Sequence, residues 1–135
     1  MLEIQEYSGN IFLKTNISEI DAEGLLGRIH ISSSTGEITL CESEGEIIVD
    51  NSTGEVTIDA SQGVFIISTS TATIIAEDVQ LSQGSFFRTS TGNININVLN
   101  KISRLALKSL TSTGTMKFEK KGDPVLTAKG EAELD

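Results

Sequence analysis

The chain has 135 residues and a formal net charge of −9, with 38% hydrophobic residues but only 4% aromatic ones. A chain of this length fits one domain, and its negative charge excludes nucleic acid as an expected partner, because nucleic-acid binding needs a basic surface. No apolar run approaches the ~20 residues of a membrane-spanning helix, so membrane insertion is not expected either.

Short segments that begin with glycine and alternate apolar with other residues predict strands from residue 9 onward. The first is residues 9–13, and a regular series follows in which glycine recurs every nine residues, at Gly27, Gly36, Gly45, Gly54 and Gly63. In this series the second and fourth residues after glycine are apolar, which is typical of a strand with one buried face. Glycine marks each corner because it adopts backbone conformations that a Cβ hinders.

The tripeptides that contain these glycines alternate between two kinds, and this alternation sets the size of the coil. Residues 34–36 and 52–54 read Ser-Thr-Gly, whereas residues 43–45 and 61–63 read Ser-Glu-Gly and Ser-Gln-Gly. The true repeat is therefore about 18 residues. We predict an all-β fold, a single-chain β-solenoid with two short strands per coil, in which stacked coils bury a common core.

The whole chain, 1–135, is expected to form this single domain. Regular repeats cover about 27–76, irregular coils cover 77–118, where Gly92 and Gly114 are 22 residues apart, and a C-terminal cap covers 119–135. Within the cap, residues 131–134 read as a polar last strand. Such a strand would cover an open end and oppose edge-to-edge aggregation.

One candidate binding feature is a stack of threonines. Thr35, Thr53 and Thr71 are 18 residues apart, so they should lie above one another at the sheet spacing of roughly 4.8 Å. We expect this ladder to be one residue wide and to lapse after Thr71.

A second candidate feature is a possible interface. Ile48, Val64 and Ile66 occupy outward positions where a solvated strand would carry polar residues. A contiguous outward apolar patch often marks an interaction site. Cover by another segment of the same chain would explain the patch equally well.

We find no residues in a catalytic, cofactor-binding or metal-binding pattern, so we expect no enzyme activity and no cofactor. His30, the only histidine, is predicted to face outward without an acid or nucleophile partner. Cys41 is a lone thiol at a corner. Glu37 and Glu55 should stack, and a weakly bound cation or splaying of the side chains into water would relieve their repulsion. The G-G-x-G-x-D motif of calcium-binding β-rolls is missing.

The Ser-Thr-Gly motif followed by alternating apolar residues resembles the repeat of an adhesin-like family of bacterial β-solenoids. The matching stretches are residues 34–40, 52–58, 89–96 and 111–118. The resemblance implies a bacterial protein of the cell envelope or extracellular space, without a catalytic site. No export signal is recognisable in the chain.

The leading hypothesis is therefore a non-enzymatic, structural or adhesion-type β-solenoid that acts through its repetitive flat faces. Its partner would be a protein or a surface glycan, and the chain itself a monomer or a weak homo-oligomer. One alternative is an element of a phage or secretion spike, in which three chains intertwine as a triple β-helix. Another is an ice-binding or cation-binding solenoid.

Overall fold

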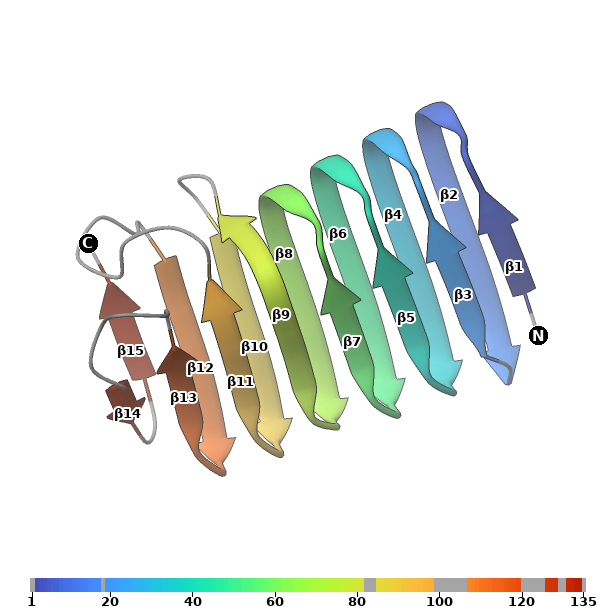
Figure 1. Cartoon of the computed structure of the whole chain (residues 1–135). Helices are drawn as coiled ribbons and strands as arrows, with labels where there is room; N and C mark the ends of the chain where they lie inside the picture. The colour runs from blue at the N-terminus through green and yellow to red at the C-terminus, as the bar shows by residue number, and fades with distance from the viewer. Residues whose placement is uncertain are drawn as a thin grey trace.

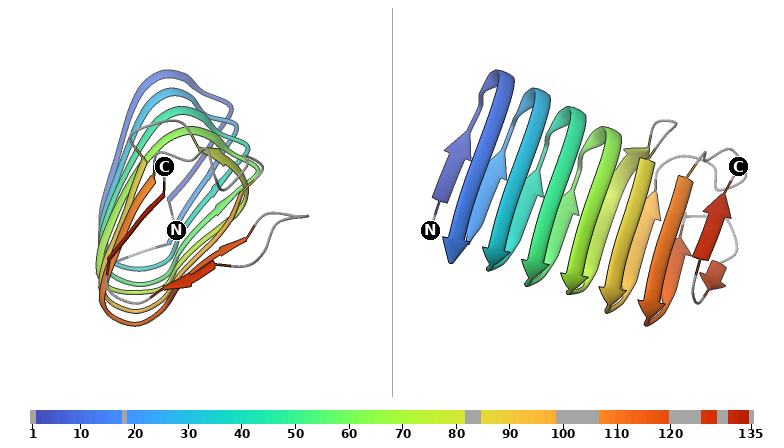
Figure 2. Two further views of the ribbon diagram at one scale, coloured as in Figure 1. Left: turned by 90° about the vertical axis from the view of Figure 1, so that its left-hand side faces the viewer. Right: turned by 180° about the vertical axis from the view of Figure 1, so that it is seen from behind.

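The computed structural model describes residues 2–17, 19–81, 85–98, 107–119, 126–128 and 131–134. Within these ranges every regular element is a β-strand, and the strands stack coil on coil along one axis (Figure 1). Seen along that axis, the coils superimpose as an elongated ring (Figure 2). The predicted all-β, single-chain solenoid is confirmed.

Each coil contributes two strands, as predicted, and the two differ in length. The shorter strands are β1 (Leu2–Gln5), β3 (Ile20–Glu23), β5 (Ile38–Cys41), β7 (Val56–Asp59), β9 (Ile74–Leu81), β11 (Ile94–Val98) and β13 (Met116–Glu119). The longer strands are β2 (Ser8–Ile17), β4 (Leu26–Thr35), β6 (Glu44–Thr53), β8 (Gln62–Thr71), β10 (Ser85–Thr91) and β12 (Leu107–Thr113). β10 and β12 have seven residues each, one fewer than β9, and are grouped here because they continue the same sheet as β8. Four of the longer strands have ten residues, more than the sequence pattern predicts, because they continue through a bend at their second residue.

The strands form two sheets around the core, and neighbouring strands of successive coils within each sheet run parallel. The short-strand sheet runs in the order β1-β3-β5-β7-β9-β11-β13, and the long-strand sheet runs β2-β4-β6-β8-β10-β12. β9 also pairs with β8, through Gln62 and Gln80, and so links the two layers at one corner. Each described strand pairs with strands of this same chain.

The register between coils is 18 residues at first and widens later. Gly9 pairs with Gly27, and Ile47 pairs with Phe65, so the regular repeat begins well before residue 27. Between β8 and β10 the step becomes 20, as in the pair Ile66 and Phe86. Between β10 and β12 it becomes 22, in agreement with the irregular spacing predicted for this part of the chain.

Glycine is required at the bends because the coils approach each other closely there. Gly63 has φ of +132°, and a Cβ built on it would overlap the carbonyl oxygen of Gly45 in the coil below. A further corner was not predicted, because its residues are mostly not glycine. It stacks Glu6, Glu42, Ala60 and Asp78, all with φ near +50°, together with Gly24, and is called the left-handed corner below.

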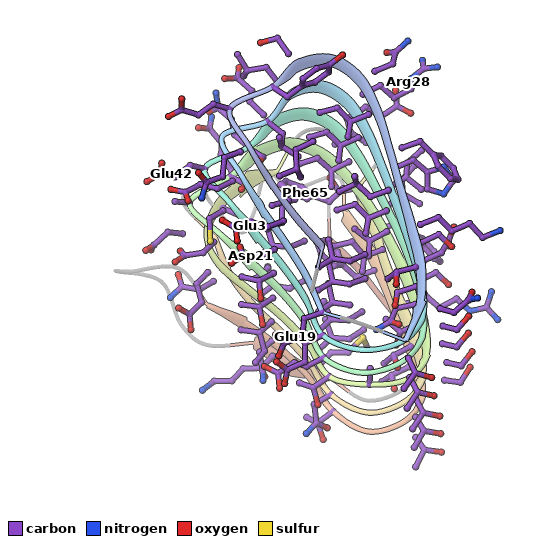
Figure 3. The ribbon with its side chains drawn as sticks, turned by 90° about the vertical axis from the view of Figure 1, so that its right-hand side faces the viewer. Glu3, Glu19, Asp21, Arg28, Glu42 and Phe65 are labelled. Atoms are coloured by element: carbon purple, nitrogen blue, oxygen red, sulfur yellow. The ribbon has the colours of Figure 1, made fainter. Side chains whose placement is uncertain are left out.

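The core is a column of inward side chains from both sheets. Ile47, Val49, Val56 and Ile58 of neighbouring strands are each 0% exposed, which confirms the predicted inward face. Phe65, inside the ring in Figure 3, stacks on Phe87 with ring centroids 6.4 Å apart. Aromatic stacking at this distance adds to the stabilisation from apolar burial.

The serines that recur every nine residues fall into two groups. Ser34, Ser52 and Ser70 are exposed, whereas Ser43 and Ser61 point into the core. The buried hydroxyls satisfy the backbone at the left-handed corner. Ser43 Oγ donates to the carbonyl of Cys41 at 3.0 Å and accepts from the backbone N–H of Leu25 at 3.2 Å. Ser61 Oγ repeats this with Asp59, at 2.9 Å.

A second buried polar column follows the Ser-Thr-Gly corner. Asn51 donates to the carbonyls of Gly36 and Gly54, and Thr69 Oγ1 donates to Thr89 Oγ1 at 2.9 Å. Ser33 Oγ and Asn51 Oδ1 have no partner within the described part of the chain. Most of these polar groups are satisfied, as burial requires.

The C-terminal end of the stack is closed by strands of opposite direction. β14 (Leu126–Ala128) pairs antiparallel with β13, and β15 (Glu131–Leu134) pairs antiparallel with β12. The predicted strand at 131–134 is confirmed, although its antiparallel direction was not foreseen. Residues 120–125, 129–130 and 135 of the predicted cap lie outside the described residues.

Introducing a charge into the core should destroy cooperative folding. Ile47→Asp and Phe65→Asp each place an unpaired carboxylate at a fully buried position. The cost is several kcal/mol, comparable to the roughly 5–15 kcal/mol stability of a whole domain. Denaturant unfolding followed by circular dichroism should show no cooperative transition for either variant. Ser52→Asp, at an exposed position of β6, should unfold like the wild type.

Two glycine substitutions should separate the crowding between coils from backbone strain. Gly9 and Gly63 share similar φ values, +128° and +132°, but only at Gly63 would an added Cβ overlap backbone atoms of another coil. Gly63→Ala should therefore lower the free energy of unfolding by ~2 kcal/mol more than Gly9→Ala does. Equal losses in urea unfolding would show that close stacking does not limit the glycine positions.

Candidate interaction surface

The outer face of the long-strand sheet carries a continuous row of large side chains. The register places Phe12, His30, Ile48, Ile66 and Phe86 side by side across β2, β4, β6, β8 and β10. We call this row the central ladder. Phe12 is 63% exposed and Ile66 36% exposed. A row of apolar and aromatic side chains in solvent is a feature of interaction sites.

All three residues of the predicted interface lie on this face. Ile48 and Ile66 are neighbours in the central ladder, and Val64 lies beside them on β8, next to Glu46 in register. No described segment covers Ile66. The contributions of Phe12 and Phe86 were missed. The 18-residue period was enough to predict that Phe12 lies beside His30. Phe86 lies beside Ile66 through a 20-residue step, which that period does not predict.

Polar contacts flank the central ladder. Arg28 Nε lies 3.5 Å from Glu46 Oε2 on neighbouring strands, and His30 Nε2 lies 3.3 Å from Asp50 Oδ2. The rings of Phe12 and His30 meet edge to face with centroids 4.8 Å apart. Contacts between such exposed groups contribute little to stability, so they orient side chains more than they hold the fold together. His30 faces outward as predicted, with Asp50 as a partner that the sequence did not reveal.

Charge is distributed unevenly around the coil. The structure describes four Lys and Arg side chains, and three of them, Lys14, Arg28 and Arg88, lie on the outer face of the long-strand sheet. The charged residues of the short-strand sheet and the left-handed corner are mostly acids: Glu3, Glu6, Asp21, Glu23, Glu42, Asp59, Glu77 and Asp78. Figure 3 shows Arg28 and Glu42 projecting from opposite sides of the ring. The acidic excess thus lies away from the central ladder.

The threonine ladder runs along the corner that follows the long strands. The register pairs Thr35 with Thr53 and Thr53 with Thr71, and all three side chains are exposed. The expected lapse after Thr71 is wrong, because Thr71 pairs with Thr91 and Thr91 with Thr113. A fixed 18-residue period does not predict this continuity, because the later steps are 20 and 22 residues long.

The threonine ladder is also broader than one residue. The exposed residues Ser34, Ser52 and Ser70 precede its threonines and share their 18-residue step. On its other side, Glu37 and Glu55 are exposed and lie on adjacent coils, because Ile38 N–H donates to the carbonyl of Glu55 at 2.9 Å. The corner thus presents hydroxyl groups bordered by carboxylates.

A shallow groove of about 370 Å³ lies where β6 and β8 begin, at the opposite end of these strands from the threonine ladder. Its lining includes Gly45 and Gly63, which have no side chains, and the polar residues Glu44, Gln62 and Gln80. Its polar groups are suited to hydrogen bonding. Among the described residues, no group of three or more His, Cys, Asp or Glu is placed to hold a metal ion.

Cys41 ends β5 on the acidic side of the coil. Partial burial raises the pKa of its thiol, and the negative charge of Asp59, Asp21, Glu23 and Glu42 raises this pKa further. A raised pKa leaves less thiolate, which is the nucleophilic form. The environment of Cys41 therefore suppresses thiol reactivity near neutral pH.

The reaction of Cys41 with Ellman's reagent should test this environment. The rate in the folded protein should be lower than in the unfolded protein at pH 8, and should rise with pH through a pKa higher than that of an ordinary thiol. Asp59→Asn removes the charge with the largest electrostatic effect and should increase the rate at pH 8. Identical pH profiles for the folded and unfolded chain would contradict the assignment.

Comparison of the chain with models of known families, with curated proteins and with solved structures found no match. The described part of the chain contains no helix long and apolar enough to cross a membrane.

Proposed function

We propose that this chain is a non-enzymatic, structural or adhesion-type module that binds a repeating polymer through its exposed side-chain ladders. The observation that carries the proposal is the threonine ladder, which continues in register from Thr35 to Thr113 across five strands. Identical groups recur at strand spacings of about 4.8 Å on a rigid support. A ligand with its own repeat can form the same contact many times, and so gain affinity by multivalency.

The partner class favoured by this surface is a glycan of a cell surface. The threonine ladder and the neighbouring serines offer hydroxyl groups, and Glu37 and Glu55 add hydrogen-bond acceptors at its border. Hydroxyls both donate and accept hydrogen bonds, and carboxylates accept them, which suits the many hydroxyls of a polysaccharide. The resemblance to the bacterial adhesin-like family agrees with this proposal and adds an envelope or extracellular location to it.

The spike alternative has less support from the arrangement of the core. A triple β-helix buries residues contributed by three intertwined chains. In this chain, Ile47, Val56 and Phe65 are fully buried by strands of the same chain, and parallel pairing joins consecutive coils. Such a coil has no need of two further chains to complete its core.

Retention on immobilised polysaccharides tests the proposal. Purified peptidoglycan, chitin and cellulose serve as probes, and the triple substitution Thr35→Val, Thr53→Val and Thr71→Val removes ladder hydroxyls while keeping side-chain shape. We expect the wild type to bind at least one probe, and the triple variant to bind it at least tenfold more weakly.

The matched control is the pair Thr39→Val and Thr57→Val, which are neighbours on the short-strand sheet. It should leave binding unchanged. The proposal fails if the wild type binds none of the three polymers, or if both sets of substitutions reduce binding equally.

The unexpected length of the threonine ladder also favours a second candidate, ice binding. Ice-binding surfaces need a regular array, and the ladder extends over five coils with serines alongside. Thermal hysteresis of the wild type, lost in the triple valine variant, would support this function over glycan binding.

A further inference from the structure

The middle of the long-strand sheet is a strand whose outward side chains carry no charge. Counting β15 at its end, the sheet runs β2-β4-β6-β8-β10-β12-β15, so β8 has three strands on each side. On the outer face β8 presents Val64, Ile66 and Ser68. Val64 and Ile66 are partly exposed, and no described segment packs over them.

The two neighbours of β8 carry complementary side chains. On one side β6 presents Ile48 in the central ladder and Asp50 in the next outward row. On the other side β10 presents Phe86 in the central ladder and Arg88 in that next row. Asp50 has a 57% exposed side chain, and Arg88 is exposed without an ion-pair partner among the described residues. The apolar centre is thus bordered by an acid on one strand and a base on the other.

We propose that two copies of this chain associate face to face through their long-strand sheets, about a two-fold axis that runs along β8. Rotation about the strand direction reverses the order of the strands and leaves each outward row opposite the same row of the partner. Ile66 then faces the partner subunit's Ile66, and Ile48 faces the partner subunit's Phe86. Asp50 faces the partner subunit's Arg88, so that two symmetric ion pairs flank an apolar centre.

Charge favours this register over its neighbours. With the axis along β6, Glu46 and Asp50 would each face their own copies, and with the axis along β10, Arg88 would face the partner subunit's Arg88. Like charges held opposite each other are unfavourable, and opposed charge patterns fix the register of an interface. The register centred on β8 avoids these repulsions and pairs Asp50 with Arg88.

The size of the face is sufficient for a moderate interface. With the axis along β8, all seven strands of one sheet lie opposite strands of the partner subunit's sheet. A patch seven strands wide and about seven residues long covers on the order of 700 Å², given strand spacings of about 4.8 Å and rises of about 3.3 Å. A standard interface buries about 800 Å² on each partner. The acids of the short-strand sheet and left-handed corner lie outside this area and do not oppose it.

The first test is the mass in solution, measured by light scattering over a dilution series. We expect the wild type to approach twice its 14.4 kDa mass at high concentration and to dissociate on dilution. Ile66→Lys should weaken association more than tenfold, since it places a charge beside its own copy at the axis. Its circular dichroism spectrum should be unchanged, because Ile66 lies on the surface. A wild type that stays at 14.4 kDa at every concentration overturns the proposal.

A charge exchange tests the register itself. Asp50→Arg and Arg88→Asp should each prevent self-association, because each variant places like charges opposite each other. Mixing the two variants should restore a dimer, since each contact then joins an acid to a base. Glu55→Arg makes the same charge change as Asp50→Arg on another side of the coil and should leave the mass unchanged. A wild-type dimer whose two charge variants stay monomeric when mixed would exclude this register.

The proposed dimer and the proposed glycan binding use different surfaces of the coil. The threonine ladder lies at a corner beyond the rows that meet in the dimer, so the triple valine variant should dimerise like the wild type. Loss of glycan binding with an intact dimer, or the reverse, therefore separates failure of one proposal from failure of the other.

Discussion

Parallel hydrogen bonding between equivalent positions of successive coils is the constraint on which the structure depends. It places each residue directly above its counterpart in the previous coil, so residues of similar type form columns along the stack. At Gly45 and Gly63 this brings backbone against backbone, and only glycine fits there. Inside, the same stacking gives an apolar column around Ile47 and Phe65, and lets Ser43 and Ser61 satisfy the corner backbone in the same way on each coil.

The stacking also organises the outside of the molecule into ladders of different chemistry. Apolar and aromatic groups follow the middle of the long strands, hydroxyls follow the next corner, and carboxylates dominate the opposite side. Because these ladders lie on separate parts of the coil, the proposed pairing of two copies would leave the threonine ladder exposed. Neither use requires a cleft, and both follow from repetition of a flat surface.

The glycine spacing and the period-two pattern were enough to predict the coil, its 18-residue repeat and its inward residues. They did not predict the left-handed corner, because Glu42, Ala60 and Asp78 adopt left-handed backbone conformations there without being glycine. The alternating tripeptides separate Ser43 from Ser52, but they do not indicate which of these two serines faces the core. The surface ladders were underestimated because Phe86, Thr91 and Thr113 follow wider coils. The contact of His30 with Asp50 joins adjacent strands and depends on side-chain direction.

The widening of the register from 18 to 20 and then 22 residues has a consequence for how such a chain can evolve. The first two extra residues fall between Leu81 and Ser85, yet Ile66 still meets Phe86 and Thr71 still meets Thr91. Coil length and surface pattern are therefore independent. Insertions between successive strands can therefore lengthen the chain while both ladders continue undisturbed. Homologous solenoids with quite different periods could in this way display the same surface, and an alignment that assumes a constant period would overlook them.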